Sequence, residues 1–153
     1  PPYRAIALRK SQTLITVKSP AMLHAPGFLT RVFDTLSRHQ ISVDLVTTSE
    51  ISVALTLDQG GMTSAFSSNL EPALDELRTF CEVSVETGLS LVAVIGNHLH
   101  SSKGVSGELF STLERINMRL SCHGASKHNL CFLVQDSDGP GVVKQLHQRL
   151  FAA

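Results

Sequence analysis

An internal repeat is the feature that most constrains the fold of this chain. Residues 27–57 align with residues 104–134 without a gap, at a constant offset of 77 residues. The aligned pairs that are identical include Phe33 and Phe110, Leu36 and Leu113, and Arg38 and Arg115. Self-similarity at a fixed spacing indicates copies of one structural unit. A chain of 153 residues has room for two such units of about 75 residues each.

Hydrophobic periodicity predicts the same order of elements in both copies. In the first copy a polar Gly/Ser stretch separates the third strand from the second helix. The predicted elements are strands at 13–18, 41–46, 51–57 and 82–86, and helices at 28–36 and 70–80. This order, βαββαβ, is the ferredoxin-like split motif, in which two helices cover one face of an antiparallel sheet. The predicted fold class is therefore α+β.

The second copy lacks its last strand, whereas the chain has one strand too many at its start. The predicted elements of the second copy are strands at 91–95, 118–123 and 129–134, and helices at 104–115 and 141–151. The extra strand is Tyr3 to Leu8. We predict that this strand completes the second unit, because an unpaired sheet edge is otherwise left open. The first unit, residues 11–88, is then inserted into the second, residues 1–10 plus 89–153.

Composition excludes several function classes. Lys+Arg and Asp+Glu both number 13, so no basic excess is available for a nucleic-acid backbone. No apolar run reaches the roughly 18 residues of a membrane span. Three widely spaced cysteines without a CxxC pair favour a reduced, cytoplasmic setting. The chain begins with Pro1 and enters a strand almost at once, so we expect a piece of a longer polypeptide.

No motif for catalysis or metal binding is found, so we expect no catalytic residues and no metal. Phosphate-loop, HExxH and GxSxG patterns are absent. Two cysteines and two histidines lie within ten residues, namely Cys122, His123, His128 and Cys131. Their spacing fits no familiar zinc pattern, and neighbours on a strand point to opposite faces. The acid pair Asp136 and Asp138 is predicted to cap the last helix.

The two copies differ in charge at equivalent positions. Asp44 and Glu50 of the first copy correspond to Ser121 and Lys127 of the second. Drift of surface charges explains this difference; the alternative is a cation that binds only to the first copy. Upstream, Gly27 precedes a helix start, whose backbone N–H groups suit a carboxylate. Pro-Gly is also a common sequence in ordinary loops, so this segment does not by itself indicate a ligand.

Taken together, these residues resemble the C-terminal regulatory region of lysine-sensitive aspartokinases, a tandem of ACT domains. The resemblance covers essentially the whole chain. The segments that carry it are Met22-Leu23-His24, Gly27-Phe28-Leu29, Ile41-Ser42-Val43-Asp44-Leu45, Thr48-Ser49-Glu50, Ser52-Val53-Ala54-Leu55, Val94-Ile95-Gly96-Asn97 and Gly124-Ala125-Ser126. As a combination they are specific to the family and not only to the fold.

The resemblance implies a feedback-regulatory module with no catalysis of its own. In this family a kinase domain of the same polypeptide phosphorylates aspartate with ATP, and that domain, with its ATP and Mg, is absent from this sequence. Two first units pair across a homodimer, and L-lysine binds in the seam as the effector. The implied lysine-binding residues are Met22, Ala25, Phe28, Leu29, Val43, Asp44, Ser49, Glu50 and Ile51. Related sequences often carry Ser where this chain has Ala25.

The residues and the resemblance suggest the same arrangement of the ligand. We expect the N–H groups of Phe28 and Leu29 to hold the lysine carboxylate. Asp44 and Glu50, with Ser49, would neutralise its two ammonium groups. Two alternatives stay open: a pure oligomerisation module, and a sensor for another amino acid such as threonine. Threonine has only one ammonium group to pair with the two acids Asp44 and Glu50, which argues against a threonine sensor.

Overall fold

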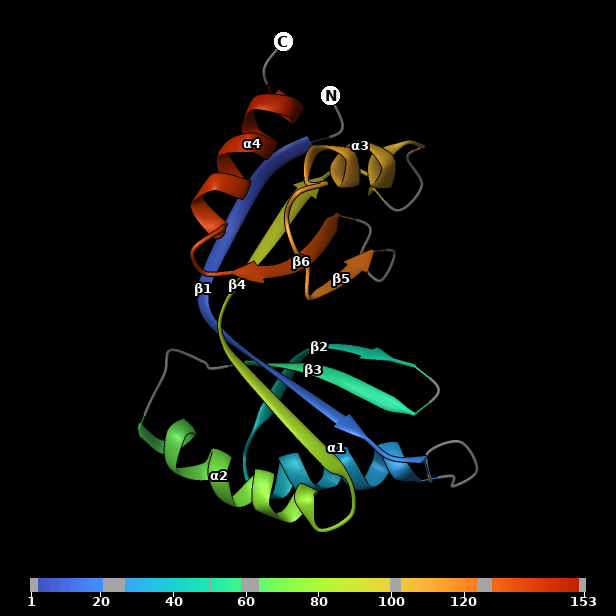
Figure 1. Cartoon of the computed structure of the whole chain (residues 1–153), viewed down its shortest axis with the longest axis vertical. Coiled ribbons are helices and arrows are strands. Elements are labelled where there is room, and N and C mark those ends of the chain that lie inside the picture. The colour runs from blue at the N-terminus through green and yellow to red at the C-terminus, as the bar shows by residue number, and fades with distance from the viewer. Residues whose placement is uncertain are drawn as a thin grey trace. The chain divides into compact units, whose positions relative to one another are not determined.

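The structure, a computed structural model, describes most of the chain (Figure 1). The described residues are 3–20, 27–49, 51–58, 64–99, 103–123 and 128–151. They form six strands and four helices: β1 (Tyr3–Lys18), α1 (Phe28–Arg38), β2 (Ser42–Thr48), β3 (Ser52–Asp58), α2 (Ser64–Arg78), β4 (Glu82–Gly96), α3 (Val105–Thr112), β5 (Leu120–His123), β6 (Asn129–Gln135) and α4 (Gly139–Phe151). The hydrogen-bonded strand order is β2-β3-β1-β4-β6-β5. None of the helices in these ranges is both long and apolar enough to cross a membrane.

Residue contacts divide the chain into two compact units. One comprises Thr13–Thr87 and is called here the inserted unit; the other comprises Pro1–Gln12 and Gly88–Ala153 and is called the outer unit. In the sequence, the inserted unit thus lies between the two segments of the outer unit. The α+β class with two ferredoxin-like units is confirmed.

Two long strands, β1 and β4, each have residues in both units. The lengths of these strands were predicted wrongly from the sequence. Strands predicted at 3–8 and 13–18 are one strand, β1, and those predicted at 82–86 and 91–95 are one strand, β4. Polar residues separate the apolar runs, but a backbone ladder needs no apolar side chain to continue. Each strand has a residue with positive φ close to the division, Ser11 at 58° and Gly88 at 70°.

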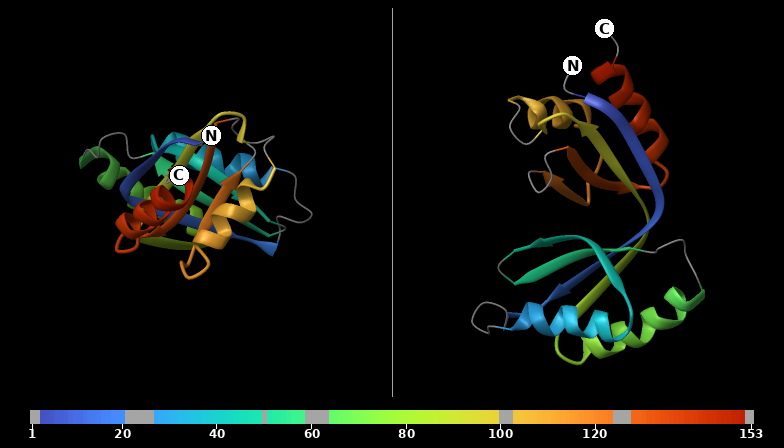
Figure 2. Two further views of the ribbon diagram at one scale, coloured as in Figure 1. Left: turned by 90° about the horizontal axis from the view of Figure 1, so that it is seen from above. Right: turned by 180° about the vertical axis from the view of Figure 1, so that it is seen from behind.

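The inserted unit has the sheet order β2-β3-β1-β4 with α1 and α2 on one face. Figure 1 and the rear view in Figure 2 both show the two helices side by side against these strands. Every second residue of β3 faces the helices, as expected for the period of a strand. The buried core combines strand residues with helix residues: Ile15, Val17, Val53, Leu55, Leu57, Val32, Leu36, Leu74 and Leu77.

The outer unit has the sheet order β1-β4-β6-β5, and its core includes residues from α3 and α4. Tyr3 belongs to this core, with Ile6 and Leu8 packed against it. The Tyr3 hydroxyl donates a hydrogen bond to Glu108 Oε2 at 2.9 Å. Burial and the neighbouring Glu108 carboxylate raise the pKa of Tyr3 to about 12. The N-terminal strand therefore completes the second copy through both packing and hydrogen bonding.

Several element ends differ from the prediction. Helix α2 begins at Ser64, inside the stretch predicted to be a polar loop, and α3 ends at Thr112, not at Arg115. Asp136 does not cap α4 with its side chain. Its carboxylate accepts a hydrogen bond from Ser90 Oγ at 2.6 Å instead. Local polarity does not distinguish a solvated first helical turn from a loop, because both are polar.

Candidate ligand-binding site

The start of α1 presents backbone donors without a capping side chain. Gly27 occupies the N-cap position with φ 96°, in the left-handed region that glycine tolerates. In the described part of the chain no side chain caps this helix, and its first turn carries no acidic residue. The first N–H groups of a helix have no acceptor within the helix and favour negative charge. This end of α1 therefore suits an anion such as a carboxylate.

Aromatic packing holds the first turn of α1 in place. Phe28 is buried and packs edge to face on Phe80, with ring centroids 6.2 Å apart. The Arg31 guanidinium carbon lies 3.9 Å from the centroid of the same Phe80 ring, a cation–π contact. Leu29, by contrast, is 38% exposed. The first turn is thus fixed on its inner side, and Leu29 remains available for contact on its outer side.

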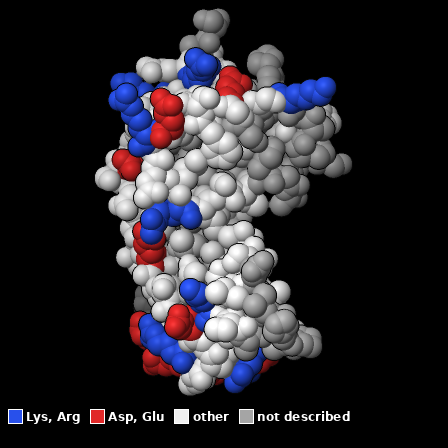
Figure 3. All heavy atoms as spheres, turned by 45° about the vertical axis from the view of Figure 1, so that its right-hand side comes forward, with Lys and Arg blue, Asp and Glu red and all other residues white. Residues whose placement is uncertain are grey.

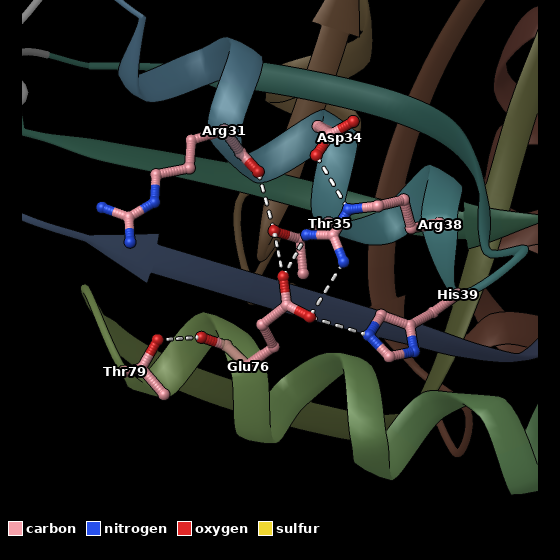
Figure 4. Close-up of polar contacts among 7 residues, drawn as sticks. All are labelled: Arg31, Asp34, Thr35, Arg38, His39, Glu76 and Thr79. Atoms are coloured by element: carbon pink, nitrogen blue, oxygen red, sulfur yellow. Dashed lines mark hydrogen bonds and ion pairs between the residues drawn. The ribbon is translucent and has the colours of Figure 1, made fainter.

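An ion-pair network ties α1 to α2 on the outer surface of the two helices (Figure 4). The Glu76 carboxylate accepts hydrogen bonds from the Arg38 guanidinium and from Thr35 Oγ1, the latter at 3.2 Å. His39 Nε2 lies 3.2 Å from Glu76 Oε1. Arg38 also donates through Nε to Asp34 at 2.9 Å. The Arg38 guanidinium is the main cause that lowers the pKa of Glu76 to about 2. These contacts fix the orientation of α1 from its C-terminal half.

Residues 49–51 connect β2 to β3, and hydrogen bonds link the described residues here to one another and to the end of β1. The Ser49 N–H donates to the Ser52 carbonyl at 2.9 Å, and the two hydroxyl oxygens lie 2.6 Å apart. The Ser19 N–H donates to the Ile51 carbonyl at 2.8 Å. Because Ser19 directly follows β1, the structure brings two of the predicted site residues, Ser49 and Ile51, to that end of the strand.

Asp44 lies in a β-bulge of β2. The register advances from Val43 opposite Leu57 to Val46 opposite Leu55, so one extra residue is accommodated opposite Thr56. The Leu45 N–H donates to the buried Thr56 Oγ1 at 2.9 Å, which stabilises the bulge. Asp44 itself is exposed and Val43 is half-buried. The bulge sits on an edge strand, since β2 ends the strand order.

One copy of the chain does not bring all the predicted residues together. Asp44 lies opposite Thr56 of β3, whereas Ser49 is hydrogen-bonded to Ser52, at the other end of β3. Thr56 lies four positions after Ser52 on β3, which is about 13 Å of extended strand. Met22, Ala25 and Glu50 lie outside the described residues. Within one copy, the position of Asp44 is thus displaced along the sheet from the residues that follow β2.

The helix starts of the two repeat copies differ in the charge of their first turn. Gly104 also has a left-handed φ, 81°, at the start of α3, but Glu108 lies in the first turn of that helix. Glu108 is the counterpart of Arg31 at the repeat offset. The helix start that suits an anion thus has a cation in the inserted unit and an acid in the outer one. Sequence reasoning missed Arg31, although the repeat alignment contained this charge reversal.

The described residues give little support for a metal site. The ranges that the structure describes contain no group of three or more His, Cys, Asp or Glu residues placed to hold a metal ion. His128 Nδ1 lies 3.3 Å from the Gly96 carbonyl, and Cys122 pairs across the sheet with Cys131. On the face drawn in Figure 3, basic and acidic side chains lie close to one another.

Comparisons with known proteins place the chain in a family. A family model described as ACT domain matches residues 15–68 and 92–150. Lysine-sensitive aspartokinase 3 of Escherichia coli is 55% identical over 152 residues, 99% of this chain and 34% of that protein. The chain therefore spans about a third of the length of this relative, matching its C-terminal part.

Two solved structures of E. coli aspartokinase III are also similar to the chain. The complex with lysine and aspartate, in the T-state, has a TM-score of 0.87 at 55% identity, covering 99% of this chain and 34% of that chain. The complex with aspartate and ADP, in the R-state, has a TM-score of 0.90 at 56% identity, with the same coverage. Because the family model accounts for well over half of the residues, the chain belongs to the ACT domain family.

Proposed function

We propose that this chain is the regulatory module of an aspartate kinase and binds free L-lysine where two inserted units meet. The observation that carries the proposal is the start of α1, which has backbone donors, no acid and a nearby Arg31. A solved complex of E. coli aspartokinase III, 55% identical to this chain, contains lysine and aspartate. A ligand with one carboxylate and two ammonium groups fits that helix start combined with acidic residues.

The carboxylate of lysine binds at the N–H groups of Phe28 and Leu29. Buried Phe28 keeps these donors in place, so little ordering is needed when the ligand binds. Hydrogen bonds to a charged group are about twice as strong as neutral ones. Arg31, one turn along the helix, adds favourable electrostatic potential. Met22 and Val43 cover the aliphatic stem of the ligand.

The ammonium groups bind to Asp44 and Glu50, with the Ser49 hydroxyl as a further partner. Asp44 lies on the edge strand β2, about 13 Å along the sheet from the turn that contains Ser49. Pairing of two β2 edges in a homodimer places the bulge of one copy beside the partner copy. Val46, an apolar residue 41% exposed on the same strand, supports an interface here. The site is then shared between two copies.

Inhibition follows from linkage between this site and a kinase domain of the same polypeptide. Lysine shifts the enzyme toward the arrangement it binds better, with a coupling of typically about 1–3 kcal/mol. ATP and Mg belong to the kinase domain and not to this chain. Such an assembly provides feedback inhibition of lysine biosynthesis.

A thermal-unfolding scan against free amino acids tests the proposal. The panel is Lys, Thr, Met, Arg and Asp at millimolar concentration. A ligand at a hundred times its dissociation constant adds about 2.7 kcal/mol, which raises Tm by roughly 5–10 °C for a chain of this length. A shift with lysine alone supports the proposal. A shift with threonine alone identifies a threonine sensor.

An oligomerisation module without a ligand is the second candidate, favoured by the exposed Val46 on an edge strand. Size-exclusion chromatography with light scattering distinguishes the two functions. A dimer whose Tm is unaffected by every amino acid in the panel indicates the oligomerisation module. A dimer whose Tm rises with lysine indicates the sensor.

A further inference from the structure

Two cysteines of the outer unit lie directly opposite each other on neighbouring strands. Cys122 of β5 is the register partner of Cys131 of β6. Register partners on an antiparallel pair point to the same face of the sheet. β5 is a strand of four residues at the end of the strand order, so Cys122 is on an edge. Neither residue has a role in the proposed lysine site.

The hydrogen bonds of β6 determine the spacing of this pair. The Gly96 N–H donates to the His128 carbonyl and the Asp136 N–H donates to the Gly88 carbonyl, each at 2.8 Å. Even-numbered residues of β6 therefore bond to β4, and odd-numbered residues such as Cys131 direct their backbone groups toward β5. Such a hydrogen-bonded pair has its Cα atoms about 5.5 Å apart. Disulfides most often span about 5.5–6 Å between Cα atoms.

The Cβ atoms are farther apart than a relaxed disulfide requires. They are separated by about 5.5 Å in hydrogen-bonded pairs, against about 3.5–4.5 Å in disulfides. Closing the bond therefore requires a small movement of β5, a short edge strand held by one neighbour. A disulfide formed with such a distortion is more easily reduced than a structural one. This spacing suits a reversible bond.

The third cysteine, Cys81, is not part of this pair. All three cysteines are half-buried, and none of them forms a disulfide. Cys81 lies in the inserted unit, where its thiol donates to the Leu77 carbonyl at 3.1 Å and burial raises its pKa. A thiol with a raised pKa forms little of the reactive thiolate. Cys81 therefore serves as an internal reference.

We propose that Cys122 and Cys131 are a redox modification site, a dithiol that a small disulfide oxidant converts reversibly to a cross-strand disulfide. The two thiols lose two protons and two electrons and form one S–S bond. Glutathione disulfide takes up both protons and both electrons, its own S–S bond breaks, and two glutathione thiols leave. The product links β5 covalently to β6.

The test is peptide mapping of the full 153-residue chain after equilibration with glutathione disulfide. Trypsin cleaves after Lys127, which separates Cys122 in peptide 120–127 from Cys131 in peptide 128–144. The expected product is these two peptides joined, with a mass lower by two hydrogen atoms, and its loss on addition of dithiothreitol. Glutathione adducts on each cysteine without the joined product would overturn the proposal.

A control variant moves one thiol by a single residue. In Ser121→Cys/Cys122→Ser the thiol points to the opposite face of β5, because side chains alternate along a strand. We expect at least about tenfold less of the joined product than in the unmodified chain under the same redox buffer. Cys81→Ser is expected to leave the yield unchanged. Equal joining in the shifted variant would show that the register does not cause the reaction, and the proposal would be wrong.

Discussion

Asp136 and Ser90 form a short hydrogen bond, in which Ser90 Oγ donates to Asp136 Oδ1 at 2.6 Å. The same carboxylate oxygen accepts the backbone N–H of Ser11 at 3.3 Å. Ser90 is fully buried, and Ser11 has a positive φ of 58°. One carboxylate thus bonds to β1 and β4 close to the points where both strands leave the outer unit. The carboxylate of Asp136 thus connects three segments of the outer unit.

Asp136→Ala is expected to destabilise the chain by about 1–3 kcal/mol, because it leaves the buried Ser90 hydroxyl without its acceptor. This corresponds to a fall in Tm of roughly 2–12 °C, measured by thermal unfolding. Adding Ser90→Ala to that variant should recover part of the loss. Glu114→Ala, which removes an exposed acid of the same unit, is the control. Equal losses in Asp136→Ala and Glu114→Ala would contradict the assignment.

Asp44→Ser copies the residue found at the equivalent position of the second repeat. If Asp44 binds an ammonium group of lysine, affinity should fall by at least about tenfold, or roughly 1.4 kcal/mol. Asp44 is exposed, so the fold should tolerate the change. Isothermal titration calorimetry provides the measurement, with Asp138→Ser in the outer unit as control. Unchanged affinity would remove Asp44 from the site.

Arg31→Glu reverses the charge in the first turn of α1, as the second repeat does with Glu108. Because an anion at a helix start is opposed by a neighbouring acid, we expect lysine affinity to fall roughly five- to tenfold, or about 1–1.4 kcal/mol. Lys144→Glu in α4 makes the same change in net charge and should leave the affinity unaltered. If both variants weaken binding equally, net charge is responsible and not the helix start.

Gly27→Ala and Gly104→Ala form a matched pair of backbone tests. Both glycines have positive φ, and a Cβ at either position meets nothing within 4 Å. Each substitution should therefore cost only the conformational penalty, about 1–2 kcal/mol of stability. Gly27→Ala alone should also weaken lysine binding, because it alters the start of α1. Calorimetry on both variants checks this, and weakened binding in Gly104→Ala would count against the assignment.

Glu76 should make stability depend on pH in the acid range. Its pKa is lowered from 4.5 to about 2, so its contribution is present above about pH 4.5 and is lost as pH falls toward 2. Glu76→Gln should remove this part of the pH dependence. Tm measured between pH 2 and 6 for both proteins provides the comparison. Parallel curves would show that the contacts with Arg38 and His39 contribute nothing to acid stability.

Much of the fold was predictable from the repeat and its periodicity. Val53, Leu55 and Leu57 alternate along β3, and Val32 and Leu36 recur at helical spacing, so strand and helix were distinguishable locally. The continuity of β1 through Arg9, Lys10 and Ser11 was missed, because a polar stretch in a strand resembles a loop in sequence.

The candidate site was predictable only in part. The helix start at Gly27 follows from local turn chemistry, and the residues of β2 follow from the repeat. The bulge at Asp44 depends on how β2 pairs with β3, and the cation–π contact of Arg31 depends on how α1 packs against Phe80, which follows α2. Neither the bulge nor the cation–π contact can be predicted from the neighbouring residues in the sequence.

The sequence by itself determined the α+β class and the order of elements within each copy. These properties depend on local periodicity and on a repeat whose two copies lie 77 residues apart. Only the tertiary structure decided the strand register that pairs Cys122 with Cys131 and the bond between Asp136 and Ser90, 46 residues apart. The physical reason is that register and long-range polar contacts are set by packing between elements distant in sequence, where a shift of one residue reverses every side chain.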